Sequence, residues 1–321
     1  MRDYAGAWLA SQTFDESTRE AITVRLRNHI NPHLGHLQLA EVTPEHIRNW
    51  VKKLHDHPLA ANYRAVLFTH VSTILNAAVA DGRIRHNPCQ ARSVTRPRAP
   101  AHKITPWSRQ RIHAVHTTLP DRYKITLTLG AGCGLRQGEV FGLADTDITG
   151  TELAINRQIK IVRGVLCFGP PKGGRTRRVP LPANVLHAVR SHQQRYPTAP
   201  VSLPWRHPRG RHLTAHLMVT RPNGRALHRS TFNTAIWGKA LTKAGIIRQP
   251  RVDGFHALRH FYASALLDAG ESITALAEHL GHSDPAFTLR VYTHLMPTSH
   301  QRTCEIINQL FPTHRNGTPT A

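Results

Sequence analysis

A proline-rich, basic stretch divides this sequence into two parts and limits the folds that the chain can adopt. Residues 93–106, SVTRPRAPAHKITP, hold three prolines and few large apolar side chains, a composition typical of a linker. We place the domain boundary between Ser93 and Thr105, with the basic linker itself at residues 96–104. A chain of 321 residues is long enough for two domains with substantial cores.

The part before the linker, residues 1–95, is expected to be helical. In VTPEHIRNWVKKL, Thr43 stands at the N-cap and Pro44 at the first helical position. The apolar residues that follow share one helical face: Ile47, Trp50, Val51 and Leu54. The stretch NYRAVLFTHVSTILNAAVADG has a similar pattern and ends at Gly82.

The part after the linker, residues 105–300, combines helices with a few strands. Thr105 is the predicted cap of its first helix. The segments ELAINRQIKIV and VLCF predict strands joined by a turn at Gly164, and GPPKGGRTRRVPLP predicts a basic hairpin tip. The predicted fold class is therefore mainly α with a small antiparallel β-sheet.

The net charge is the strongest compositional indication of a partner. Lys and Arg number 42 against 19 acidic residues, which gives a formal net charge of +23. Such a balance favours binding to a polyanion, most simply nucleic acid. A membrane-surface protein is the competing class, but we find neither a basic amphipathic helix nor a lipidation signal.

Several other classes lack their sequence signals. The four cysteines are far apart and form no C-x-x-C pair, which argues against a zinc or redox motif and fits a reducing cytoplasm: Cys89, Cys133, Cys167 and Cys304. The histidines contain no H-E-x-x-H pattern, so we predict no metal site and no cofactor. The start MRDYAGAWLA lacks a signal-peptide pattern, so a cytoplasmic location is expected.

Two clusters in the first half of the second part carry candidate chemistry. In GLRQGEV, Arg136 and Glu139 lie three residues apart, so on a helix they share one face. An ordinary exposed ion pair is the alternative interpretation. In PKGGRTRRVPL, Lys172 is on a glycine-rich turn, where a mobile ammonium group can reach a phosphate or a leaving oxygen. The arginines just beyond it are candidate DNA contacts: Arg175, Arg177 and Arg178. A solvated charge run is the alternative for this cluster.

Two further clusters follow near the C-terminal end. In VDGFHALRHFYASALLDAG, His256 and Arg259 lie near a helix start, where free backbone N–H groups favour an anion. We expect His260 in the same segment to be a packing or surface residue. In HLGHSDPAFTLRVYTHL, His282 follows a helix end and Tyr292 lies on the next helix; a half-buried packing tyrosine is the alternative.

Together these side chains suit phosphoryl transfer without a metal. Arginines neutralise a pentavalent phosphate, and a tyrosine supplies a hydroxyl nucleophile whose covalent link conserves the phosphodiester energy. A tyrosine of ordinary pKa needs a base and a cationic environment, and the leaving 5′-oxygen needs an acid, for which a lysine is suitable.

The ordered motifs resemble those of the tyrosine recombinases, specifically the phage-type integrases, over nearly the whole chain. GLRQGEVFGL is similar to the first family box, PKGGRTRRVPL to the hairpin with the family lysine, HALRH to the His-x-x-Arg box and LGHSDPAFTLRVYTHL to the last box. STILNAAVADGRIRHNP is similar to the helical core-binding domain. One departure is Ala144, where the family often has a tryptophan; another is the little room for an arm-binding domain.

The resemblance implies a SAM-like core-binding domain at residues 1–95 and an α+β catalytic domain at 105–300. It implies a site-specific DNA recombinase that cleaves and rejoins strands through a 3′-phosphotyrosyl intermediate, with catalytic Arg136, Lys172, His256, Arg259, His282 and Tyr292 and with Glu139 in support. It also implies a homotetramer on double-stranded recombination sites, a Holliday junction intermediate and an optional directionality factor.

Two other functions remain open at this point: a type IB topoisomerase-like enzyme and a catalytically inactive DNA-binding regulator. The tail is also open. Ile306, Ile307, Leu310 and Phe311 form a short apolar stripe. We expect a helix within residues 301–321 that docks into a neighbouring protomer, with packing on its own domain as the alternative.

Overall fold

The computed structural model describes residues 1–98, 104–249, 252–282 and 284–292. It divides into two compact units. The first consists of residues 1–102 together with 160–167 and 204–211, and the second consists of the remaining described residues. The predicted tail helix at 301–321 and most of the predicted linker at 96–104 lie outside the described residues.

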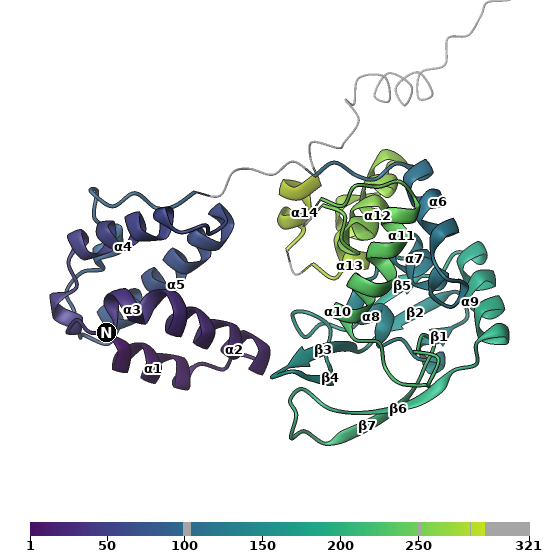
Figure 1. The fold of residues 1–321 in the computed structure, drawn as a ribbon, viewed down its shortest axis with the longest axis horizontal. Helices are drawn as coiled ribbons and strands as arrows, with labels where there is room; N and C mark the ends of the chain where they lie inside the picture. The colour runs from purple at the N-terminus through teal and green to yellow at the C-terminus, as the bar shows by residue number, and fades with distance from the viewer. Residues whose placement is uncertain (99–103, 250–251, 283, 293–321) are drawn as a thin grey trace, which may run out of the picture. The chain divides into compact units, whose positions relative to one another are not determined.

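The first unit is helical, as Figure 1 shows, and the expected helices are present. Its elements are α1 (Arg2–Ser11), α2 (Glu16–Arg25), the π-helical turn η1 (Leu26–Ile30), α3 (Asn31–Leu34), η2 (Leu39–Glu41), α4 (Pro44–Asp56), α5 (Ala61–Ala80) and η3 (Pro88–Gln90). The hydroxyl of Thr43 caps α4 by accepting from the backbone N–H of His46 at 3.3 Å. The predicted face of α4 is buried at Ile47, Trp50 and Leu54.

A single apolar cluster holds this unit together. It joins α1 to α4 and α5 through side chains that include Leu9, Ile30, Trp50 and Leu75. The indole N–H of Trp50 donates to the carbonyl of His29 at 2.9 Å, so the one polar atom of this buried ring has its partner. The helices therefore pack as one body.

The second unit surrounds small sheets with helices. Its helices are α6 (Arg109–Thr118), α7 (Asp121–Gly132), α8 (Gln137–Phe141), α9 (Ala183–Arg195), α10 (Arg229–Thr231), the π-helical η5 (Phe232–Trp237), α11 (Gly238–Lys243), α12 (His256–Asp268), α13 (Ile273–Leu280) and α14 (Pro285–Tyr292), with a 3-10 turn, η4 (Asp145–Asp147). The strands of the chain are β1 (Ile148–Thr149), β2 (Glu152–Ile155), β3 (Gln158–Val162), β4 (Val165–Gly169), β5 (Arg177–Pro180), β6 (Ala199–Pro204) and β7 (His212–Leu217). Residues 160–167 of β3 and β4 and the last residue of β6 belong to the first unit, and the other strand residues belong to the second. The predicted fold class, mainly helical with small antiparallel sheets, is confirmed.

The strand pairing corrects one prediction. Strands β3 and β4 pair around the turn at Gly164, as expected, but β5 pairs antiparallel with β2 in the order β1-β2-β5. The segment with Lys172 is thus a connection between two sheets and not a hairpin tip. Pairing across distant strands depends on tertiary contacts that a local sequence pattern does not contain.

The start of the second unit also differs from the sequence prediction. Helix α6 begins at Arg109, and Ser108, not Thr105, caps it by accepting from the N–H of Arg111 at 3.2 Å. Trp107 explains the later start, because its ring stacks on Trp237 with 6.0 Å between centroids and is buried.

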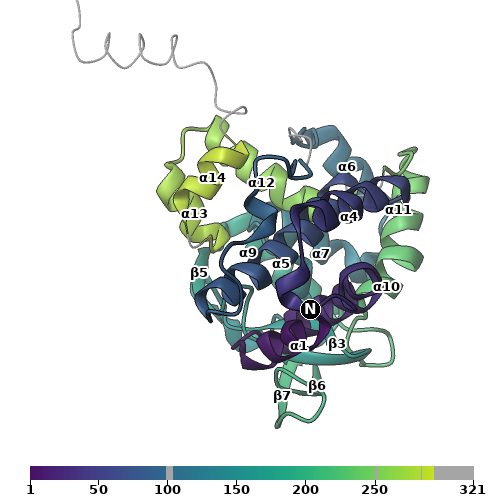
Figure 2. The ribbon, with the colours of Figure 1, turned by 90° about the vertical axis from the view of Figure 1, so that its left-hand side faces the viewer.

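Helices α12, α13 and α14 lie side by side, as both Figure 1 and Figure 2 show. An apolar cluster that includes Tyr262, Leu276, Leu280 and Tyr292 joins them. Helix α13 ends at Gly281, whose left-handed φ of +63° turns the chain toward α14. In the described part of the chain no helix is long and apolar enough to span a bilayer.

Candidate active site

A buried carboxylate between two arginines forms the base of the site. Arg136 is the N-cap residue of α8, and its backbone N–H donates to Glu139 Oε2 at 2.9 Å while its Nη1 donates to Oε1 at 3.0 Å. Arg177, on β5, adds a bidentate pair to the same carboxylate at 3.0 and 2.8 Å. Glu139 is only 1% exposed.

The charge balance around Glu139 keeps it ionised. Burial by itself raises the pKa of this carboxyl, but the hydrogen bonds and charge of Arg177 and the charge of Arg136 outweigh burial and lower the pKa to about 2. Glu139 therefore orients both arginines as a permanent anion at neutral pH.

Arg177, a predicted DNA contact, has its side chain turned into the protein in this structure. Its side chain is 5% exposed, and besides Glu139 it donates through Nε to the carbonyl of His279 at 2.7 Å. Because successive residues of a strand face opposite sides, its neighbour Arg178 is exposed, where it pairs with Glu152 at 2.8 Å. Arg175 is also exposed, so Arg175 and Arg178 remain predicted DNA contacts.

Arg177 in turn explains a glycine. A Cβ added to Gly281 would lie 2.9 Å from Arg177 Cδ, and Gly281 also has a φ of +63°. Both the close approach and the left-handed backbone require glycine here. The pairing of Arg177 with Glu139 is therefore connected to the turn that precedes His282.

A third arginine, Arg259 on α12, is even more deeply buried, at 1% exposed. Its Nη1 donates to the carbonyl of Gly134 at 2.9 Å, and its Nη2 donates to the carbonyl of Leu280. The same Nη2 lies 3.1 Å from Nε2 of His282. Burial, followed by the charge of Arg136, lowers the pKa of Arg259 to about 9, which still leaves it cationic at neutral pH.

The contacts of His282 determine its tautomer. A guanidinium only donates, so His282 Nε2 accepts from Arg259, and the proton of the neutral ring is on Nδ1. That N–H donates to Thr288 Oγ1 at 2.7 Å. Desolvation, followed by the charges of Arg259, Arg136, Arg177 and Lys172, lowers the pKa of His282 to about 4, in agreement with a neutral ring.

Tyr292 is buried, and its hydroxyl has a histidine partner. The phenol oxygen lies 2.8 Å from Nδ1 of His260, and the tyrosine is 2% exposed. Burial raises the pKa of Tyr292 to about 12, although the charges of Arg259 and Arg136 act in the opposite direction. Thr288 is one helical turn before Tyr292 on the same buried face of α14.

His256 and Lys172 complete the cationic surroundings. His256 is the first residue of α12, and its ring is edge-on to that of His260, with 4.5 Å between centroids. Desolvation, followed by the charges of His260, Arg259, Arg136 and Lys172, lowers the pKa of His256 to about 3. Lys172 is exposed, beside two glycines of positive φ, Gly173 and Gly174.

All the predicted catalytic residues lie in the second unit, and hydrogen bonds, ring contacts or electrostatic interactions connect them. The sequence prediction missed two members of this network, His260 and Thr288. The only signals for them were helical spacings: His260 is four residues after His256, and Thr288 is four residues before Tyr292. Within the described residues, no three His, Cys, Asp or Glu side chains converge as a metal site requires.

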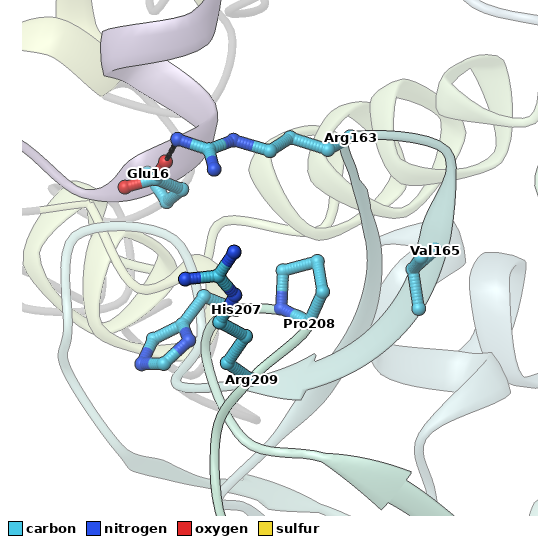
Figure 3. Close-up of a pocket in the computed structure, with 6 residues that line it drawn as sticks. All are labelled: Glu16, Arg163, Val165, His207, Pro208 and Arg209. Atoms are coloured by element: carbon cyan, nitrogen blue, oxygen red, sulfur yellow. Dashed lines mark hydrogen bonds and ion pairs between the residues drawn. The ribbon is translucent and has the colours of Figure 1, made fainter.

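A separate pocket in the first unit contains none of these residues. It has a volume of about 480 Å³ and is lined by Glu16, Arg163, Val165, His207, Pro208 and Arg209 (Figure 3). In Figure 3 the guanidinium of Arg163 points at the carboxylate of Glu16, with which it pairs. The candidate chemistry is therefore outside this pocket.

The fold and the site define a class of DNA strand-breaking enzyme, and comparison with known proteins agrees. The model described as "Phage integrase family" matches residues 108–298, and that described as "Phage integrase, N-terminal SAM-like domain" matches residues 1–55. The chain belongs to the phage integrase family of tyrosine recombinases, enzymes that act on DNA.

Individual relatives are similar over most of their length. The Tyrosine recombinase XerC-like protein of Caldanaerobacter subterraneus subsp. tengcongensis is 27% identical over 308 residues, 89% of this chain and 76% of the relative. The Tn1549 transposon integrase in complex with transposon right end DNA has a TM-score of 0.80 at 19% identity, over 95% of this chain and 98% of that chain. The lambda integrase tetramer bound to a Holliday junction has a TM-score of 0.67 at 15% identity, over 88% of this chain and 76% of that chain.

Proposed function

We propose that this chain is an active site-specific recombinase that cuts DNA by attack of Tyr292 on a phosphodiester. The products are a 3′-phosphotyrosyl link and a free 5′-hydroxyl; the 5′-hydroxyl of a partner strand then attacks that link. The observation that carries the proposal is the position of the Tyr292 hydroxyl within a group of cations that includes Arg136 and Arg259. A family member that only bound DNA would have no need of this arrangement.

The arginines supply the electrostatic stabilisation. The phosphorane formed during attack carries more negative charge than the phosphodiester, so fixed guanidinium groups favour it over the ground state. The side chain of Arg136 is 18% exposed and forms an ion pair with the buried Glu139. An arginine that is fixed at one end and partly exposed is suited to a direct contact with the scissile phosphate. Arg259 reaches the same phosphate beside His282.

The nucleophile needs help with its proton. With a pKa of about 12, ionising Tyr292 at pH 7 costs roughly 7 kcal/mol, at about 1.36 kcal/mol for each pKa unit. Once the phenol oxygen is bonded to phosphorus, it no longer has to carry a negative charge. A group that accepts the phenol proton during the attack therefore avoids the cost of a free phenolate and speeds the step. His256 is the assisting base or acid that the family resemblance assigns.

The leaving group is served by Lys172. An alkoxide at the 5′-carbon is a poor leaving group, and an ammonium that protonates it removes that cost. Lys172 is exposed next to the glycines of the β4–β5 connection, and its charge is among those that lower the pKa of both His256 and His282. It is therefore near the proposed phosphate position.

His282 would bind a phosphate oxygen through Nε2. In the free protein this atom accepts from Arg259, while Nδ1–H donates to Thr288. To donate to phosphate from Nε2 and keep Thr288, the ring must bind a second proton. The negative charge of a phosphodiester favours this by raising the pKa of the ring from about 4.

The remaining assignments follow the family. Residues 1–95 would form the core-binding domain and residues 105–300 the catalytic domain, with Arg175 and Arg178 on the DNA backbone. Since lambda integrase forms a tetramer on a Holliday junction, we propose a homotetramer on two recombination sites, with a directionality factor as an optional partner and the cytoplasm as the location.

The test is covalent trapping on a suicide substrate, a duplex whose nick lets the cleaved strand diffuse away. Wild-type protein should form a protein–DNA adduct, and Tyr292→Phe should bind the site yet form none. Tyr262→Phe is a matched control, because Tyr262 is a buried tyrosine on α12. An adduct that persists in Tyr292→Phe refutes the assignment, and one that is absent from wild type favours a non-catalytic regulator. Exchange between two marked sites separates recombination from topoisomerase-like rejoining.

A further inference from the structure

The hydroxyl of Tyr292 bonds to a histidine outside the expected catalytic set. His260 Nδ1 lies 2.8 Å from the phenol oxygen, and the two rings are tilted with 5.8 Å between centroids. The two residues come from different helices, α12 and α14, which share an apolar cluster that fixes their separation. The packing of α12 and α14 in this cluster therefore holds the two side chains in contact.

His256 is less well placed for the same proton. It precedes His260 by one helical turn, and the two rings are 4.5 Å apart edge to face, so His256 lies next to His260. The hydrogen bond of the phenol runs to His260. In the tautomer of His260 that has its proton on Nε2, Nδ1 accepts from the phenol O–H. An acceptor within hydrogen-bond reach of the proton that it removes meets the first requirement for a general base.

We propose that His260 is the residue that takes the proton of Tyr292 during attack. The inference rests on the proposed role of Tyr292 as nucleophile. The phenol O–H bond breaks and its proton moves to the lone pair of His260 Nδ1. The phenol oxygen forms the bond to phosphorus, the bond from phosphorus to O5′ breaks, and O5′ receives a proton from Lys172 Nζ. Religation runs in reverse, so the imidazolium of His260 returns its proton to the departing tyrosine.

The nearby charges make the ability of His260 to accept a proton depend on bound DNA. The cations of the site act on two neighbours of His260: the charges of Arg259, Arg136 and Lys172 act on His256, one turn earlier on α12, and those of Arg259 and Arg136 act on Tyr292 on α14. The cations favour the phenolate but oppose an imidazolium. A bound phosphodiester adds the negative charge that permits one.

The first experiment uses His260→Asn in the full chain, because the Asn amide occupies the position of Nδ1 and can hydrogen-bond but cannot hold the proton. His113→Asn, an exposed histidine on α6, is the matched control. Single-turnover adduct formation on the suicide substrate should slow by about 10²-fold or more in His260→Asn, with site binding unchanged. The defect should shrink as pH rises, because hydroxide replaces the base.

A second substrate separates this role from acid catalysis. A 5′-bridging phosphorothiolate has a good leaving group and does not need Lys172, but it still requires a deprotonated tyrosine. His260→Asn should therefore remain slow on it. A normal rate on either substrate, or a defect that is constant with pH in a folded variant, overturns the proposal. If Tyr292→Phe still forms an adduct, the proposed function fails instead.

A third measurement does not depend on the folding of His260→Asn. A fluorinated tyrosine, whose phenol is more acidic, is incorporated at position 292 of the otherwise wild-type chain. If an imidazole accepts the proton, the ascending limb of the pH–rate profile keeps its position. If the phenol titrates directly into solvent, the limb moves to lower pH, and the proposal is refuted.

Discussion

Replacing Glu139 by glutamine should destabilise the second unit by about 3 kcal/mol. The carboxylate accepts from the Arg136 backbone, from Arg136 Nη1 and twice from Arg177. Glutamine keeps the shape but loses the charge and turns one acceptor into a donor that faces guanidinium N–H groups. Losing one partner of a buried pair typically costs about 3–5 kcal/mol.

The pKa of Glu139 gives an independent magnitude. It falls from an ordinary 4.5 to about 2, and about 2.5 pKa units correspond to about 3.4 kcal/mol. The sign follows from linkage: a depressed folded-state pKa contributes stability that is fully present above pH 4.5 and lost as the pH falls through about 2. The difference between wild type and Glu139→Gln should therefore shrink to less than half by about pH 3.

Urea unfolding followed by hydrogen exchange of peptides from α8 and β5 measures this locally, since two units need not unfold together. Glu152→Gln is the control: Glu152 pairs with Arg178 at a similar distance of 2.8 Å, but the two side chains are 47% and 67% exposed. An exposed pair contributes about 0–1 kcal/mol. Equal losses in the two variants, or a Glu139→Gln loss that stays constant down to pH 3, would contradict the reasoning.

Three further predictions follow from the same network. Lys172→Ala should slow cleavage of an ordinary phosphodiester but be largely rescued on a 5′-bridging phosphorothiolate; equal defects would mean that the lysine only binds DNA. Thr288→Val should remove the acceptor of His282 Nδ1–H, lower stability by about 1–3 kcal/mol and slow single-turnover cleavage while binding persists; an unchanged cleavage rate would exclude the orienting role. Gly281→Ala should lower the thermal midpoint more than Gly150→Ala, because both have positive φ but only the former meets a side chain within 3 Å; equal shifts would show that backbone strain alone matters.

The helices of the first unit were predictable because their signals are local. The cap at Thr43 and the spacing of Ile47, Trp50 and Leu54 lie within a few residues of one another, and the structure has the helix and its buried face as predicted. The strand pairing of β5 was not predictable, since its partner β2 is more than twenty residues away and no pattern in either strand specifies the other.

The face of α12 shows a different limit. The apolar spacing of this helix by itself favours an interior face at Leu258, Phe261, Ala265 and Leu266. The structure buries Leu258, but it also buries Arg259, Tyr262 and Leu267, while Ala265 is exposed. A periodicity argument counts arginine as polar, so it fails where a guanidinium is buried among carbonyls. A candidate functional residue is where such local rules are expected to fail.

The same limit applies to the site residues. The family motifs indicated the candidate catalytic residues, but His260 and Thr288 join them through hydrogen bonds to Tyr292 and His282. Such partners become visible only when the helices are placed in space.

The environment of Arg259 has a consequence for the stability of the second unit. This buried guanidinium donates to two carbonyl oxygens and lies against a neutral imidazole, while the nearby carboxylate of Glu139 is bonded to two other arginines. A buried cation with so little counter-charge raises the free energy of the folded state. An anion that pairs with Arg259 would supply the missing counter-charge, so we expect anion binding to raise the free energy of unfolding of the second unit. Part of the stability of this fold is thereby coupled to whatever anion the site accepts.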